Sequence, residues 1–95
     1  MIASKGMPLY RNLNGNSGVH SYELGGTEIN PGRVDDPEWI EVRFMDGMTY
    51  RYTRKRLGDW TFDVLVGHAR VGQGLNAYIN TTPAVKFGYE HKWRS

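Results

Sequence analysis

The chain has 95 residues, which fits one domain near the lower size limit for a single hydrophobic core. It has no cysteine, which excludes disulfides and thiolate metal sites, and its formal charge of +2 gives weak support for a nucleic-acid partner. No apolar run is long enough to span a membrane, and residues 1–6 lack the apolar middle of a signal peptide, so we expect a cytoplasmic protein.

The first 17 residues are rich in Asn, Gly and Ser and show no sustained period. We expect them to form a flexible N-terminal arm, with one domain over residues 18–95. Val19–Leu24 alternates and ends at two glycines, which predicts a first strand. That strand would carry three residues on one face: His20, Tyr22 and Leu24.

Residues 30–37 contain two prolines and a glycine, which predicts a loop. The two alternating segments that follow, Trp39–Met45 and Met48–Thr53, meet at Asp46-Gly47 and predict a β-hairpin. A two-residue loop would set apolar residues opposite polar ones. A three-residue loop with Gly47 in the left-handed conformation gathers the large apolar groups on one face by these pairs: Phe44 with Met48, Val42 with Tyr50, and Ile40 with Tyr52.

The remaining residues favour helices. Asp59 is the expected N-cap of a helix that Gly72 or Gly74 ends. Its apolar stripe is Phe62, Leu65, Val66 and Ala69, widened by Trp60, Val64 and Val71. We also expect a helical turn over 75–80. A last helix should begin at Thr82-Pro83, with Val85 and Tyr89 facing inward. The predicted fold class is α+β: a three-stranded antiparallel sheet packed against two or three C-terminal helices.

A basic run lies at the end of the hairpin and is the first candidate site. Arg54, Lys55 and Arg56 follow Arg51, whose cross-strand partner on the polar face is Glu41. Cationic groups beside aromatic rings suit a nucleic acid or nucleotide, although a solvated connection has the same composition.

Amide side chains form a second candidate site, in which Gln73, Asn76 and Asn80 with Tyr78 line a pocket for a base or ribose. A purely structural use of these side chains is the competing interpretation. The candidate interface residues are Trp39, on the polar face, and Trp93, in a basic tail. The tail also holds Lys86, His91, Lys92 and Arg94.

We expect no catalytic site, metal site or cofactor. The three histidines have no ligand-like spacing, and His20 and Ser21 should point to opposite faces of their strand, which spoils them as a base and nucleophile.

Several segments together resemble the KTSC-type domain, a small module found at the C-terminus of some lysyl-tRNA synthetases and as free-standing bacterial and phage proteins. They are Gly18-Val19-His20-Ser21-Tyr22-Glu23, the hairpin from Phe44 to Thr53, Gly58 before a helix, and Gly72-Gln73-Gly74-Leu75-Asn76-Ala77-Tyr78-Ile79-Asn80. The resemblance covers roughly residues 18–90 and implies a small non-enzymatic module for which nucleic-acid binding has been suggested.

Three functional hypotheses follow. The first is a binding module for a phosphate-bearing ligand, either nucleic acid or nucleotide. The second is a phage-encoded inhibitor that blocks a host protein through Trp39 and the loop at 30–37. The third is a homo-oligomer that sequesters a nucleotide messenger between its subunits.

Overall fold

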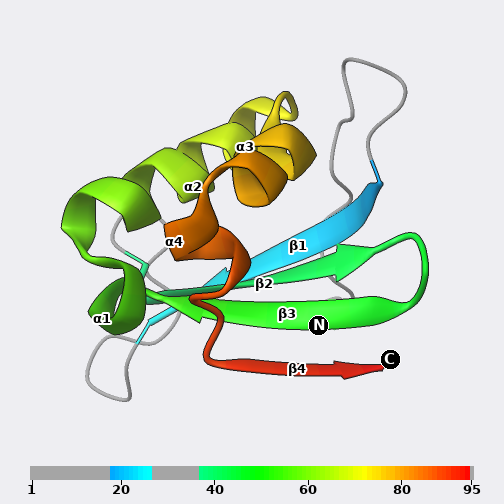
Figure 1. The fold of residues 1–95 in the computed structure, drawn as a ribbon, viewed down its shortest axis with the longest axis horizontal. Coiled ribbons are helices and arrows are strands. Elements are labelled where there is room, and N and C mark those ends of the chain that lie inside the picture. The colour runs from blue at the N-terminus through cyan, green and yellow to red at the C-terminus, as the bar shows by residue number, and fades with distance from the viewer. Residues whose placement is uncertain (1–17, 27–36, 95) are drawn as a thin grey trace, which may run out of the picture.

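A computed structural model of the chain describes residues 18–26 and 37–94. In chain order, its elements are β1 (Val19–Gly25), β2 (Trp39–Phe44), β3 (Met48–Thr53), α1 (Arg54–Leu57), α2 (Asp59–Val71), α3 (Leu75–Thr81), α4 (Pro83–Lys86) and β4 (His91–Arg94). The strands form one antiparallel sheet in the order β1-β2-β3-β4, and α2, α3 and α4 cover one of its faces (Figure 1). The predicted α+β class is confirmed, with a fourth strand that was not predicted. The predicted N-terminal arm and most of the predicted loop at 30–37 lie outside the described residues.

The hairpin between β2 and β3 has the predicted register. Ile40 pairs with Tyr52 and Val42 with Tyr50, so their side chains share the face that the helices cover. Gly47 has a φ of +91°, a conformation that glycine adopts without steric cost. The alternation of apolar residues therefore determines the register of the hairpin. The turn has the three residues that this register needs, with Gly47 as its left-handed residue.

The core lies between the sheet and α2. Its α2 residues are the predicted stripe of Phe62, Leu65, Val66 and Ala69. From the sheet it takes Val19, Ile40, Val42 and Tyr52, and from the later helices Leu75, Ile79 and Val85. Trp60 and Val71 do not widen the buried face of α2 as predicted, because they lie at its two ends and are 81% and 53% exposed.

Glycines set the ends of α2. Asp59 is the first helical residue rather than the predicted N-cap, which is Gly58 with a φ of +85°. The chain turns sharply between α1 and α2, and at a positive φ glycine has an advantage over aspartate. At the other end Gly72, one of the two glycines predicted to end this helix, adopts the left-handed conformation, and its N–H donates to the carbonyl of His68.

A β-bulge in β1 changes which residues face inward. Tyr22 pairs with Val42, but the register shifts between Val19 and Ser21, so Val19 pairs with Phe44 and is fully buried. His20 is exposed, and the prediction that it shares a face with Tyr22 is wrong. One extra residue in a strand reverses the alternation beyond it.

The C-terminal segment returns to the sheet. Val85 is buried and Tyr89 packs against the core, as predicted, but α4 ends at Lys86 and the chain then enters β4. β4 pairs antiparallel with β3, with Lys92 opposite Tyr50 and Trp93 opposite Thr49. Among the described residues, no helix combines the length and apolar character needed to cross a lipid bilayer.

Candidate functional site

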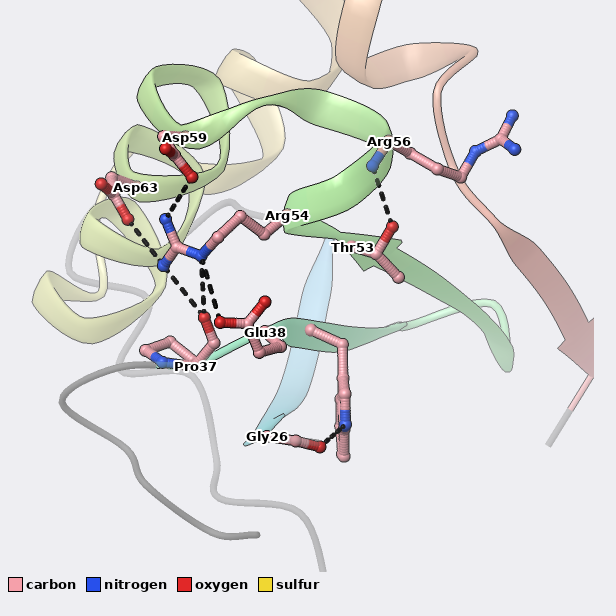
Figure 2. Close-up of polar contacts among 9 residues, drawn as sticks. Gly26, Pro37, Glu38, Thr53, Arg54, Arg56, Asp59 and Asp63 are labelled. Carbon is pink, nitrogen blue, oxygen red and sulfur yellow. Dashed lines mark hydrogen bonds and ion pairs between the residues drawn. The ribbon is translucent and has the colours of Figure 1, made fainter. Parts of the chain in front are cut away.

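Arg54, the first residue of α1, joins two parts of the fold (Figure 2). Its Nη2 and Nε donate to the carbonyl oxygen of Pro37 at 2.9 and 3.2 Å. Its Nη1 lies 3.2 Å from Oδ1 of Asp59, and its Nη2 lies 3.0 Å from Oδ1 of Asp63. The guanidinium also lies 4.7 Å from the centre of the Phe62 ring. Because these groups occupy the guanidinium, Arg54, which belongs to the first candidate site, is not a free charge for a ligand.

The electrostatics of Arg54 agree with this structural role. Its side chain is only 18% exposed, and burial alone would lower its pKa. The hydrogen bonds to Asp63 and Asp59 and the negative charges of these two residues together outweigh that effect and raise the pKa of Arg54 above its ordinary value. Arg54 therefore ties the start of β2 to α2.

Arg51 and Trp39 form a second structural contact, on the sheet face that the helices leave uncovered. The Nη1 of Arg51 lies 2.6 Å from Oε2 of Glu41, the predicted partner, and its Nε lies 3.2 Å from Oε1 of Glu90. Its guanidinium stacks 4.2 Å from the centre of the Trp39 ring. The Nε1 of Trp39 donates to the carbonyl of Gly26 at 3.1 Å. The predicted interface residue Trp39 is thus held by contacts within its own fold.

Lys55 and Arg56 are the exposed members of the basic run. Together with Arg51 they line a groove of about 610 Å³ that also contains Glu38 and Glu90. Arg51 is already paired with Glu41 and Glu90, so a phosphate in this groove would have to compete with carboxylates for that guanidinium.

A more favourable site lies on the helix-covered side of the sheet. We call it the aromatic cleft, a cavity of about 510 Å³ between α3, α4 and the hairpin, which is a size typical of small-molecule sites. Its lining side chains include Phe44, Tyr50, Tyr89, Phe87, Lys86 and Lys92, together with the amides of Asn76 and Asn80.

The rings in the cleft are packed against one another. Tyr50 lies edge-on to Phe44 and to Tyr89, with ring centres 5.4 and 5.2 Å apart. Tyr52 lies parallel to Tyr50 at 6.4 Å, and burial raises the pKa of Tyr52 well above its ordinary value, so its phenol stays neutral. Phe87 also lines the cleft and is 71% exposed.

Two lysines give the cleft its charge. The Nζ of Lys92 lies 5.3 Å from the centre of the Tyr89 ring, and the Nζ of Lys86 lies 5.7 Å from that of Phe87. Asp46 is the acidic residue among the described lining residues, and its Oδ1 already accepts a hydrogen bond from the Met48 N–H. The cleft therefore combines apolar ring surface with net positive charge.

The predicted amide cluster divides between two places. Asn76 and Asn80 line the aromatic cleft. Gln73 lies instead at the end of α2, where its main-chain carbonyl accepts a hydrogen bond from Nδ1 of His68 at 2.9 Å. The His68 ring also packs against Tyr78, with ring centres 5.0 Å apart, and burial raises the pKa of Tyr78. Gln73 and Tyr78 thus belong to the junction between α2 and α3.

Two further predictions concern β1 and β4. His20 and Ser21 do not point apart, because the bulge brings His20 Nδ1 within 3.0 Å of Ser21 Oγ. Ser21 is only 1% exposed, which shields its hydroxyl from a substrate. Trp93 is half-buried on β4, and its ring lies 5.3 Å from that of His91.

Sequence reasoning noted Lys86 and Lys92 only as parts of a basic tail and did not place them in a site. Phe87 and Tyr89 between them were a usable signal, because cations interleaved with rings are typical of nucleotide sites. The sequence analysis did not predict that the tail returns to pair with β3, because the four residues of β4 are too few to show a strand pattern.

Comparisons with known proteins give no match to a family model, a curated protein or a solved structure.

Proposed function

We propose that this chain is a non-enzymatic binding module and that its aromatic cleft binds a phosphate-bearing ligand with an aromatic ring, such as a nucleotide or a residue of a nucleic acid. The observation that carries the proposal is the presence of Lys86 and Lys92 in one cavity with the rings of Tyr50, Tyr89 and Phe87. Lysine ammonium groups bind phosphate, and aromatic rings stack on bases.

The proposal moves the site away from the basic run of residues 54–56. There Arg54 is engaged by carboxylates, and the adjoining groove mixes charges of both signs. In the cleft, Asp46 is the acidic lining residue, and its main-chain carbonyl is bound by Arg94, a further cation close by. The net charge of the two linings is similar, but Arg51 of the groove is paired with glutamates, whereas Lys86 and Lys92 of the cleft lie beside aromatic rings.

The resemblance to KTSC-type domains forms part of this proposal. Its most specific stretch, Gly74 to Ile79, begins α3 and supplies Asn76 and Ile79 to the wall of the cleft. A motif that shapes a cavity wall suits a module whose purpose is binding.

The test is a titration of the full chain with a fluorescently labelled twelve-residue oligo(dT) and with AMP at 50 and 200 mM salt. If two lysine–phosphate contacts hold the strand, oligo(dT) affinity should fall about 7-fold between these salt concentrations. The double variant Lys86→Ala, Lys92→Ala should bind both probes at least about 10-fold more weakly, because it lacks both cations of the cleft.

Lys55→Ala is the matched control, since it removes an exposed lysine of the basic run and should change affinity less than about 2-fold. The proposed site would be refuted if the affinity for oligo(dT) did not change between 50 and 200 mM salt. It would also be refuted if the control and the double variant lost the same affinity. Native mass spectrometry of the same samples reports how many subunits and ligands each particle contains.

A further inference from the structure

The two asparagines of the cleft lie one turn apart on α3 and contact each other. The Nδ2 of Asn80 donates to the main-chain carbonyl of Asn76 and to its side-chain Oδ1, both at 3.0 Å. A main-chain carbonyl only accepts hydrogen bonds, so the group of Asn80 that faces it must be the NH₂. This contact fixes which way the Asn80 amide is turned.

The orientation of Asn80 determines that of Asn76. Because the Asn80 NH₂ is a donor, the atom of Asn76 that meets it must be Oδ1. The atoms left over are the Nδ2 of Asn76 and the Oδ1 of Asn80, and neither has a hydrogen-bond partner among the described residues. The pair therefore offers one donor and one acceptor at the wall of the cleft.

Each nucleobase carries a hydrogen-bond donor and an acceptor side by side on an edge, and asparagine amides bind such edges in nucleic-acid complexes. We infer that Asn76 and Asn80 bind the edge of a nucleobase stacked in the aromatic cleft, so that its ligand is a nucleoside phosphate. This inference rests on the proposed function and adds the part of the ligand that the lysines do not recognise.

The cleft has the components for both halves of such a ligand. The sheet and the segment after α4 supply rings, α3 supplies the amides, and α4 and β4 supply one lysine each. A phosphorylated sugar would use the lysines but would leave the ring surface of Tyr50 and Phe87 without a flat partner. The base should therefore contribute a large share of the affinity.

The experiment is a set of NMR titrations of the ¹⁵N-labelled full chain with AMP, CMP, ribose 5-phosphate and inorganic phosphate. We expect AMP and CMP to bind at least about 10-fold more tightly than ribose 5-phosphate, with the largest shifts at residues 76–80 and 86–92. If ribose 5-phosphate binds as tightly as the nucleotides, the inference is wrong, and only the lysine–phosphate part of the proposed function stands. If none of the four ligands binds, and oligo(dT) does not bind either, both fail.

A variant tests the amides directly. Asn76→Leu has nearly the same shape and no charge change, and it should reduce the ratio of AMP to ribose 5-phosphate affinity at least about 5-fold. Gln73→Ala, which removes an exposed amide outside the cleft, is the control and should leave the ratio unchanged. An unchanged ratio in a folded Asn76→Leu protein would overturn the inference.

The same chemistry could come from a free nucleotide or from a strand, and oligo(dA) of eight residues separates the two sources. Affinity for the strand more than about 100-fold above that for AMP would identify a single-stranded nucleic acid as the ligand, because further contacts lie outside the cleft. Comparable affinities would identify the free nucleotide.

Discussion

Replacing Arg54 with alanine should destabilise the fold more than any other change in the basic run. The guanidinium holds the Pro37 carbonyl, two carboxylates of α2 and the face of the Phe62 ring. Alanine removes all of these contacts at once. Pro37 is buried, so its carbonyl would lose its charged donor in a place that water reaches poorly.

The magnitude follows from the exposure of each partner. A hydrogen bond from a charged donor to the buried carbonyl stabilises by about 1.5–3 kcal/mol. Asp59 and Asp63 are 84% and 63% exposed, so their ion pairs contribute only about 0.2–1 kcal/mol each. The contact with the Phe62 ring adds about 0.5–1 kcal/mol. Since such contributions overlap, we expect a loss of about 3 kcal/mol in the free energy of unfolding.

Urea denaturation followed by circular dichroism measures this loss. For a domain of this size, about 3 kcal/mol lowers the urea midpoint by about 1–3 M. Arg54→Lys should recover about 1 kcal/mol, because an ammonium keeps the charge but cannot make the forked contact with Pro37 and Asp63. Lys55→Ala is the neighbouring control and should stay within about 0.5 kcal/mol of the wild type. A loss below about 1 kcal/mol for Arg54→Ala would refute the structural role and return Arg54 to the ligand-site candidates.

Three further changes test the fold. Gly25→Ala would place a methyl group 2.0 Å from the Trp39 ring, so the ring must move; we expect a loss of about 1–3 kcal/mol, seen as a melting temperature lower by at least about 4 °C. Gly47→Ala forces a side chain into a turn with a φ of +91° and should cost about 1–2 kcal/mol in urea denaturation, whereas a neutral result would contradict the bulged turn. Tyr52 should ionise only when the protein unfolds, because burial raises its pKa in the folded state. Its contribution to the free energy of unfolding is therefore complete below about pH 10 and falls by up to about 1.4 kcal/mol per pH unit above that. Tyr52→Phe should flatten this alkaline slope, which ultraviolet difference spectra and urea midpoints at pH 9–12 will show, and an unchanged slope would contradict the raised pKa.

The sequence pattern was sufficient to predict those features that depend on residues close together in the chain. Alternation on both sides of Asp46-Gly47 determined the hairpin register, because a slip of one residue would turn every apolar side chain to the other face. The buried stripe of α2 followed in the same way from a 3.6-residue period, and the pattern placed the end of the helix at Gly72 or Gly74, of which the structure has Gly72. The ion pair of Arg51 with Glu41 came directly from that register.

Contacts between distant segments decided the rest. β4 forms because its four residues pair with β3, although all the helices lie between these two strands in the sequence. Four residues are too few to show the alternating pattern by which a strand is predicted. The bulge that moves His20 outward and Val19 inward is one residue of irregularity, set by packing against β2. The aromatic cleft likewise needs Tyr50, Asn76, Lys86 and Lys92 together, and only the folded chain brings them to one wall. The sequence by itself thus determined which apolar side chains face inward. Three-dimensional packing determined which cations form ion pairs with carboxylates and which lie beside aromatic rings.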